Sequence, residues 1–389
     1  MERKVIIAGP PYGMHNIGDE AILESIVQQF SASAEITVMT YGSEWLESAY
    51  PFVEKLPIPT MYCKPFLGLT ASPRKKIFSS IKNSFFPNLS HFANKDLFLC
   101  GGATILSDCP WHVLKLVQQA SHQGVPSVFW AVGMAEVKDA ETRSEIVKVC
   151  NSSSVDHIYT RDEFTQERLV RYGVAAEKVS VCYDAAYVLE GNPDSLYSVL
   201  PEDIKEHYED ECPNICISIS GEADVTDQNH IKEIKKYIES VTEYANVFLV
   251  PTGLGSHCRD LDILKTLQIN NKTFLIDWEL TPAQLIAFLR NMSVIVSSRL
   301  HCSIFGANVG APSINLIRNT KQEDFSKLFG LNALEMETLT SDKLVKYTNE
   351  VLSNRQELSE SIRRKIDEIR KVHLATREQV IATYLKGAK

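Results

Sequence analysis

Short apolar runs typical of strands alternate with helix-like segments along most of the 389-residue chain. The first apolar run covers 4–9 and is followed by a helix-like segment at 19–30. The alternation continues to about residue 189 and restarts with the apolar run at 214–220. Repeated strand–helix units of this kind build parallel sheets with helices on both faces. The pattern therefore predicts an α/β protein with doubly wound, Rossmann-like folding.

The alternation is interrupted once, by a stretch rich in proline and acidic residues at 191–213. A chain of this length favours two domains of roughly 150–200 residues each. We therefore expect an N-terminal Rossmann-like domain over 1–190, a linker over 191–213 and a C-terminal Rossmann-like domain over 214–340. The charged stretch 341–389 contains no strand-like run. We expect it to form a helical tail that packs back on the N-terminal domain.

Composition limits the classes of partner that the protein can bind and the cellular compartment in which we expect it. The net charge of −9 and a pI near 5.7 argue against general nucleic-acid binding. The nine cysteines are scattered without a Cys-x-x-Cys pair, and no side-chain cluster has the spacing of metal ligands. We therefore expect neither a metal nor a cofactor. The sequence contains no apolar run of the roughly 20 residues that a membrane span needs and no signal-peptide pattern, so we expect a cytoplasmic protein.

One segment stands apart from the acidic whole. No acidic residue lies between Glu54 and Asp96, and basic residues alternate there with phenylalanines. We interpret 55–95 as an insertion in the N-terminal domain. Within it, 64–92 is suited to peripheral contact with an anionic membrane surface, which would bring the protein to the inner face of the cell membrane. The alternative is a helix packed on the domain with its basic face in water.

The strand ends carry the candidate chemistry, because ligands of parallel sheets bind beyond the carboxyl ends of the strands. The β-branched run 294–296 ends in two serines, and Arg299, Leu300 and His301 then stand where a helix would begin. A helix N-terminus attracts anions, arginine matches a carboxylate or phosphate, and histidine moves protons near neutral pH. The segment predicts an anion site. The alternative is a salt-bridged arginine with a histidine packed beside it.

Other polar or glycine-bearing segments also follow strands. Arg161 does so, either as a second anion ligand or as a surface partner of Asp162 or Glu163. We expect Arg161 to converge with Arg299 and His301 in one cleft. Candidates for the acceptor side or the cleft are Asn16, Asp19, Gly101, Gly102 and His257. The alternative is a local turn for the two glycine-bearing segments and an incidental histidine for His257.

Taken together, these segments resemble the polysaccharide pyruvyl transferase family. The residues that carry the resemblance are, in chain order, 16–23, 101–102, 160–174, 184–189, 299–312 and Lys321. The resemblance implies two Rossmann-like halves facing a cleft, similar to GT-B glycosyltransferases. The chain departs from the family pattern at Ala103, where another glycine is expected.

The resemblance implies transfer of pyruvate from phosphoenolpyruvate to a sugar of a polysaccharide or its precursor, as a cyclic ketal, with release of phosphate. The donor-binding residues that it implies are Arg161, Arg299, Leu300, His301 and Lys321, and Arg299 and His301 also become the catalytic candidates. The expected partners are phosphoenolpyruvate and a saccharide acceptor, lipid-linked or free. Two alternatives stay open: a GT-B-type glycosyltransferase that uses a nucleotide sugar, and a sugar-phosphate binding protein without turnover.

Overall fold

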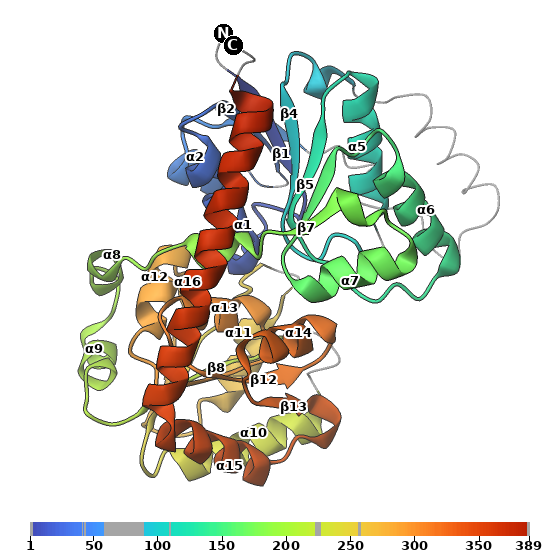
Figure 1. Cartoon of the computed structure of the whole chain (residues 1–389). Helices are drawn as coiled ribbons and strands as arrows, with labels where there is room; N and C mark the ends of the chain where they lie inside the picture. The colour runs from blue at the N-terminus through green and yellow to red at the C-terminus, as the bar shows by residue number, and fades with distance from the viewer. Residues whose placement is uncertain are drawn as a thin grey trace, which may run out of the picture. The chain divides into compact units, whose positions relative to one another are not determined.

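The computed structural model describes residues 3–40, 42, 44–57, 89–108, 110–221, 227–255 and 258–386. The chain divides into two compact units, each built on one parallel sheet. Unit 1 consists of Met1–Met14, Ile22–Ala185 and Val372–Lys389. Unit 2 consists of His15–Ala21 and Ala186–Lys371. Figure 1 shows the elements of both units, most of them labelled.

The sheet of unit 1 has seven strands in the order β3-β2-β1-β4-β5-β6-β7. Every neighbouring pair is parallel. The order reverses between β1 and β4, which is the switch point of a doubly wound sheet. The strands are β1 (Lys4–Ala8), β2 (Glu35–Thr40), β3 (Glu54–Pro57), β4 (Leu97–Gly101), β5 (Ser127–Val132), β6 (His157–Thr160) and β7 (Val179–Val181).

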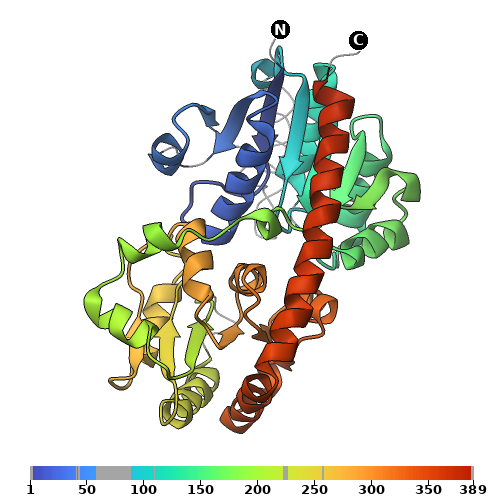
Figure 2. The same ribbon diagram turned by 60° about the vertical axis from the view of Figure 1, so that its left-hand side comes forward.

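Helices cover both faces of this sheet and bury a separate core on each. One core joins α5 (Trp111–His122), α6 (Ala140–Asn151) and α7 (Glu163–Tyr172) to the strands. The other joins α1 (Ile17–Phe30), α2 (Glu44–Ala49) and the end of α16 (Arg355–Val380) around Trp130. Figure 2 shows α1 and the last turns of α16 on the same side of the sheet. The predicted α/β architecture with helices on both faces is confirmed.

Unit 2 repeats the same design with six strands, again all parallel, in the order β10-β9-β8-β11-β12-β13. Its strands are β8 (Asn214–Ser218), β9 (Asn246–Leu249), β10 (Thr273–Leu275), β11 (Val294–Ser297), β12 (Ser313–Ile317) and β13 (Ala333–Glu335). Its helices, besides the first part of α16, are α8 (Pro193–Tyr197), α9 (Glu202–Tyr208), α10 (Gln228–Val241), α11 (Asp260–Leu267), α12 (Pro282–Leu289), α13 (Leu300–Asn308), α14 (Thr320–Phe329) and α15 (Ser341–Ser353).

The borders of the two units differ from the expected domain borders. The expected linker 191–213 contains α8 and α9 and belongs to unit 2, because Leu196 and Ile204 are buried there. The expected tail 341–389 is helical over almost all of the part that the structure describes, but α15 packs against α10 in unit 2. From Val372 onward α16 belongs to unit 1, where apolar residues near its end join the core.

Most of the basic, aromatic insertion lies outside the described residues. Of the stretch 64–92, which we expect to contact a membrane surface, the structure describes only 89–92, a short 3₁₀ helix. Phe92 of this helix is buried and packs edge-on against Phe98, with ring centroids 5.2 Å apart. Within the described ranges, no helix combines the length and the apolar character that crossing a bilayer requires.

The backbone conformation at Ala103 accounts for the glycine that the family resemblance leads us to expect there. Ala103 follows β4 with φ of +53°, in the left-handed region that favours glycine. This conformation costs a residue with a side chain about 1–2 kcal/mol. We therefore expect Ala103→Gly to raise the free energy of unfolding by roughly 0.5–1 kcal/mol, the strain relieved less the extra entropy of an unfolded glycine.

Urea denaturation checks this expectation, with Ala375→Gly as the matched control. Ala375 is exposed in the interior of α16, where the same exchange lowers the free energy of unfolding by about 1 kcal/mol. Equal losses in both variants would contradict the strain at Ala103.

Candidate functional site

The turn between β11 and α13 is pinned to the neighbouring strand β8. The Ser297 hydroxyl accepts a bond from the Arg299 amide at 3.0 Å and donates to the Arg299 carbonyl at 2.9 Å, which closes the turn. The Ser298 amide donates to the Ser218 carbonyl at 3.0 Å, and the Ser298 hydroxyl accepts from the Ser220 amide. These bonds place Arg299 directly before the first turn of α13.

A buried carboxylate holds the guanidinium of Arg299. Asp260, the first residue of α11, is fully buried, and the Arg299 side chain is 16% exposed. Nε of Arg299 donates to Oδ2 of Asp260 at 3.0 Å, and Nη2 donates to Oδ1 at 2.5 Å. The Gly221 amide also donates to Oδ1, at 2.8 Å, and the Gly253 amide to Oδ2, at 3.0 Å. Each carboxylate oxygen therefore accepts one backbone bond and one arginine bond, as a buried charge requires.

The two glycines in this arrangement leave no room for a side chain. A Cβ on Gly221 would lie 2.3 Å from the backbone carbonyl of Arg259. A Cβ on Gly253 would lie 2.7 Å from the side chain of Cys258 and 3.3 Å from Nη2 of Arg299. Gly221 and Gly253 therefore lie close to the chain just before Asp260, and this close approach brings their amides to its carboxylate. We name the group of Gly221, Gly253, Asp260 and Arg299 the arginine clamp.

Residues from the start of the chain complete this edge of unit 2. The Ile17 amide donates to the Thr252 carbonyl, and the Leu254 amide donates to the His15 carbonyl, both at 3.0 Å. The pairing places Gly18 against His301, because a Cβ on Gly18 would lie only 2.1 Å from Nδ1 of the imidazole.

The predicted residues Asn16 and Asp19 lie in the same segment. The side-chain amide of Asn16 donates to Oδ2 of Asp19 at 2.8 Å. Both residues belong to unit 2, together with Arg299, Leu300 and His301.

Lys321 stands at the N-terminus of α14, which follows the neighbouring strand β12. The side chain of Asn319 caps this helix by accepting a bond from the Lys321 amide at 3.2 Å. One residue later, Gln322 donates from Nε2 to the Ser298 carbonyl at 2.7 Å. The N-termini of α13 and α14 therefore lie at the same edge of the sheet, and both favour negative charge.

Arg161 follows β6 in unit 1 and is 5% exposed. Its guanidinium packs on Gly133, where a Cβ would lie 2.6 Å from Cζ. Its Nε donates to Asp162 at 3.3 Å, and Asp162 caps α7 by accepting from the Thr165 amide at 2.6 Å. The pairing of Arg161 with Asp162 is thus buried rather than on the surface. Arg161 and Arg299 belong to different units, and their convergence stays a prediction.

Helix α1 packs closely against Gly101 and Gly102. A Cβ on Gly101 would lie 2.5 Å from the side chain of Ile26, and one on Gly102 would lie 2.1 Å from that of Ile22. Gly102 also has φ of +72°. These contacts account for both glycines by packing, and their role at the acceptor side or the cleft stays a prediction. His257 lies outside the described residues.

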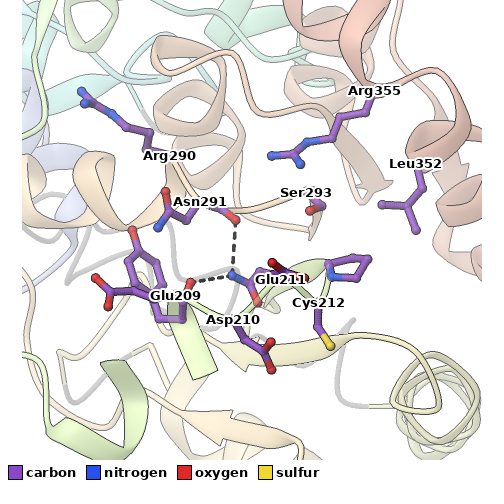
Figure 3. Close-up of a pocket in the computed structure, with 12 residues that line it drawn as sticks. Glu209, Asp210, Glu211, Cys212, Arg290, Asn291, Ser293, Leu352 and Arg355 are labelled. Carbon is purple, nitrogen blue, oxygen red and sulfur yellow. Dashed lines mark hydrogen bonds between the residues drawn. The ribbon is translucent and has the colours of Figure 1, made fainter. Parts of the chain in front are cut away.

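A polar cavity of about 420 Å³ lies at the opposite edge of the sheet of unit 2 (Figure 3). Asn214 and Ser293, near the starts of β8 and β11, line it. The side-chain amide of Asn214 donates to the Tyr208 carbonyl at 2.9 Å and to the Asn291 carbonyl at 3.5 Å. None of the predicted site residues lines this cavity. Across the described ranges, no group of three or more histidine, cysteine or acidic side chains is placed to hold a metal ion.

Sequence reasoning missed the residues that hold the predicted ones in place. Asp260 begins α11, seven residues after Gly253, but nothing in the local pattern selects Arg299, 39 positions away, as its partner. Gly18 falls within the segment that carries the family resemblance, yet only the fold brings it to His301.

A family model described as polysaccharide pyruvyl transferase matches residues 16–320. The chain belongs to the polysaccharide pyruvyl transferase family. The matched range includes Arg161, Asp260, Arg299 and His301, and it ends one residue before Lys321. This is a family of transferases whose acceptors are saccharides. The comparison with curated proteins gives no match.

Solved structures similar to this pyruvyl transferase family member share its fold at low sequence identity. The UDP-GlcNAc 2-epimerase from Methanocaldococcus jannaschii has a TM-score of 0.59 and 14% identity, over 90% of this chain and 93% of that one. Anabaena Alr3699/HepE in complex with UDP-glucose has 0.60 and 13%, over 98% of both chains. A glycosyltransferase from Rickettsia africae has 0.60 and 11%, over the full length of both. The fold is therefore of the GT-B-like kind.

Proposed function

We propose that the protein transfers pyruvate from phosphoenolpyruvate to a saccharide, forming a cyclic ketal across two hydroxyls and releasing phosphate. The observation that carries the proposal is the edge of unit 2 where the clamped Arg299 precedes α13 and His301 lies in the first turn of that helix. Family membership supports the same reaction.

The chemistry of the donor suits the groups at this edge. Phosphoenolpyruvate carries a carboxylate and a phosphate, and the planar fork of Arg299 matches either anion. The N-termini of α13 and α14, with Lys321 on the second, add partial and full positive charge. We assign donor binding to Arg161, Arg299, Leu300, His301 and Lys321.

Ketal formation needs proton transfer rather than a protein nucleophile. A proton added to the methylene carbon of the donor makes its neighbouring carbon cationic, and one sugar hydroxyl oxygen bonds to that carbon. The bond from this carbon to the phosphate oxygen breaks, and the second hydroxyl oxygen takes its place. The two hydroxyls release two protons, which balance the one gained by the methyl group and the one carried away by phosphate. His301 is the group that we assign to proton transfer.

The test is release of phosphate from phosphoenolpyruvate across a panel of saccharide acceptors, lipid-linked and free. Acceptor-dependent phosphate release supports the proposal. Release of a nucleoside diphosphate from a nucleotide sugar would instead establish a glycosyltransferase, a candidate kept because a structural neighbour was crystallised with UDP-glucose. Binding without either product would establish a sugar-phosphate binding protein. A lipid-linked acceptor would place the reaction at the inner face of the cell membrane, where 64–92 would make the contact.

Arg299→Ala and Arg161→Ala should each weaken phosphoenolpyruvate binding by roughly 10–150-fold. This range corresponds to loss of a charge-assisted hydrogen bond worth about 1.5–3 kcal/mol. Titration calorimetry measures the dissociation constants. Arg171→Ala is the matched control, because Arg171 is 63% exposed on α7 and pairs with Glu136. Near-normal donor affinity in both test variants would rule out the two-arginine donor site.

A further inference from the structure

We propose that Asp260 is a positioning residue: it fixes the plane in which the Arg299 guanidinium meets the donor anion. The inference rests on the proposed function, since it names phosphoenolpyruvate as that anion. Asp260 is fully buried, so it acts on the donor only through Arg299.

The geometry of the clamp accounts for such a role. A guanidinium carries five N–H donors in one plane. Two of them are committed to the two oxygens of Asp260, which fixes the rotation of the group about its side chain. The Gly221 and Gly253 amides fix the carboxylate in turn. The orientation of Arg299 is thus set by the backbone of two loops before any ligand arrives.

The clamp is costly for the fold. A buried ion pair is seldom more stable than an apolar pair of similar volume. Arg259, directly before Asp260, has φ of +52°, which is strained for a residue with a side chain. Gly221 and Gly253 admit no side chain at their positions. Three unfavourable features at one place are typical of a functional site rather than of a stabilising one.

Simple electrostatics and positioning predict opposite effects for the loss of this carboxylate. The charge of Asp260 offsets that of Arg299, so removing it should strengthen the attraction for an anionic donor. If Asp260 positions Arg299, removing it should weaken donor binding. Asp260→Asn separates the two effects, because an amide keeps the shape but turns a donor N–H₂ toward two of the four groups that now donate to Asp260.

The experiment is a double-mutant cycle on phosphoenolpyruvate affinity, measured by calorimetry on the full chain. We expect Asp260→Asn to weaken binding about tenfold or more. In the Arg299→Ala background the same substitution should change binding by less than about twofold, the tolerance of independent sites. Glu243→Gln is the matched control, because it removes an exposed carboxylate of the same unit and should leave affinity within about twofold.

Two results overturn the inference: unchanged or tighter binding in Asp260→Asn, and the same loss in both backgrounds, which would mark a merely structural residue. Thermal unfolding followed by circular dichroism verifies that each variant is folded. If Asp260→Asn does not fold, Gly221→Ala disturbs the clamp without changing a charge, and the same cycle applies to it.

Binding and turnover separate this inference from the proposed function. If the protein binds phosphoenolpyruvate and shows the coupling but releases no phosphate with any acceptor, the proposed function is wrong and the positioning role of Asp260 stands. If turnover and donor affinity are unchanged in Asp260→Asn, only the positioning role is wrong. If the wild-type protein does not bind phosphoenolpyruvate, both are wrong.

Discussion

His301→Ala is expected to lower the turnover number by about 100-fold or more, with a much smaller change in phosphoenolpyruvate affinity. General acid–base catalysis contributes about 10²–10⁴-fold to rates, and His301 is the residue to which we assign proton transfer in the proposed reaction. Steady-state kinetics of phosphate release, together with direct donor binding, give the two quantities. A proportionate loss in both would make His301 a binding residue.

Gly18→Ala provides an independent test of the same group. The new methyl carbon would lie 2.1 Å from Nδ1 of His301, so the imidazole must move. Gly18 has ordinary helical backbone and lies in α1, where alanine is otherwise favourable. We expect a loss of turnover similar in kind to that of His301→Ala, and little further loss when the two substitutions are combined. Full turnover in Gly18→Ala would contradict the placement of the ring.

Acid should destabilise unit 1 through one buried histidine. His373 of α16 is fully buried against Trp130, with ring centroids 5.1 Å apart. Its Nδ1 lies 2.8 Å from the Cys182 carbonyl and its Nε2 lies 3.0 Å from Oε1 of Gln29. Burial lowers the pKa of His373 from 6.5 to about 4, against the opposing effects of the Cys182 carbonyl and the charge of Asp184.

The sign of the effect depends on which state binds the proton. Below pH 6.5 the unfolded chain protonates His373 while the folded chain does not, down to about pH 4. The unfolded state therefore gains protons first, and the free energy of unfolding falls by roughly 3 kcal/mol as the pH falls across this window. Above pH 6.5 the contribution is fully present.

Urea denaturation at a series of pH values measures the effect. His373→Gln removes the titrating group, and its stability should depend less on pH between 6.5 and 4 than that of the wild type. The difference between the two curves isolates His373 from the carboxylates that also titrate in acid. Parallel curves would contradict a depressed pKa of His373.

The two parallel sheets could be predicted from the sequence because each buried strand is a short apolar run followed by a helical pattern. The run that ends at Ser297 and the one before Arg161 are examples, and Arg299 and Arg161 do follow these strands. A residue that comes directly after a strand can be recognised from the residues next to it in the sequence. For that reason the position of Arg299 at the start of α13 could be predicted from its own segment.

Partners from distant segments could not be predicted in this way. The pairing of Ile17 with Thr252 joins backbone groups, which are the same in every residue and leave no trace in periodicity. It moves 15–21 into unit 2, against the expected border. The left-handed backbone at Arg259 could not be predicted either, since an arginine does not indicate a positive φ as a glycine would. The contacts that orient Arg299 and His301 depend on such long-range or backbone features.

The chain passes between the two units four times, near residues 14, 21, 185 and 371. Neither unit is therefore a single exchangeable block of sequence. A fragment cut at 186–371 would keep the arginine clamp but lack Gly18, and one cut at 1–185 would lack His373 and the apolar end of α16. Chimaeras that exchange halves between relatives at the 185/186 junction would consequently combine segments of different parents within each unit. Unit 2 is exchanged intact only when 15–21 moves together with 186–371, and unit 1 only when 372–389 moves together with 1–14 and 22–185.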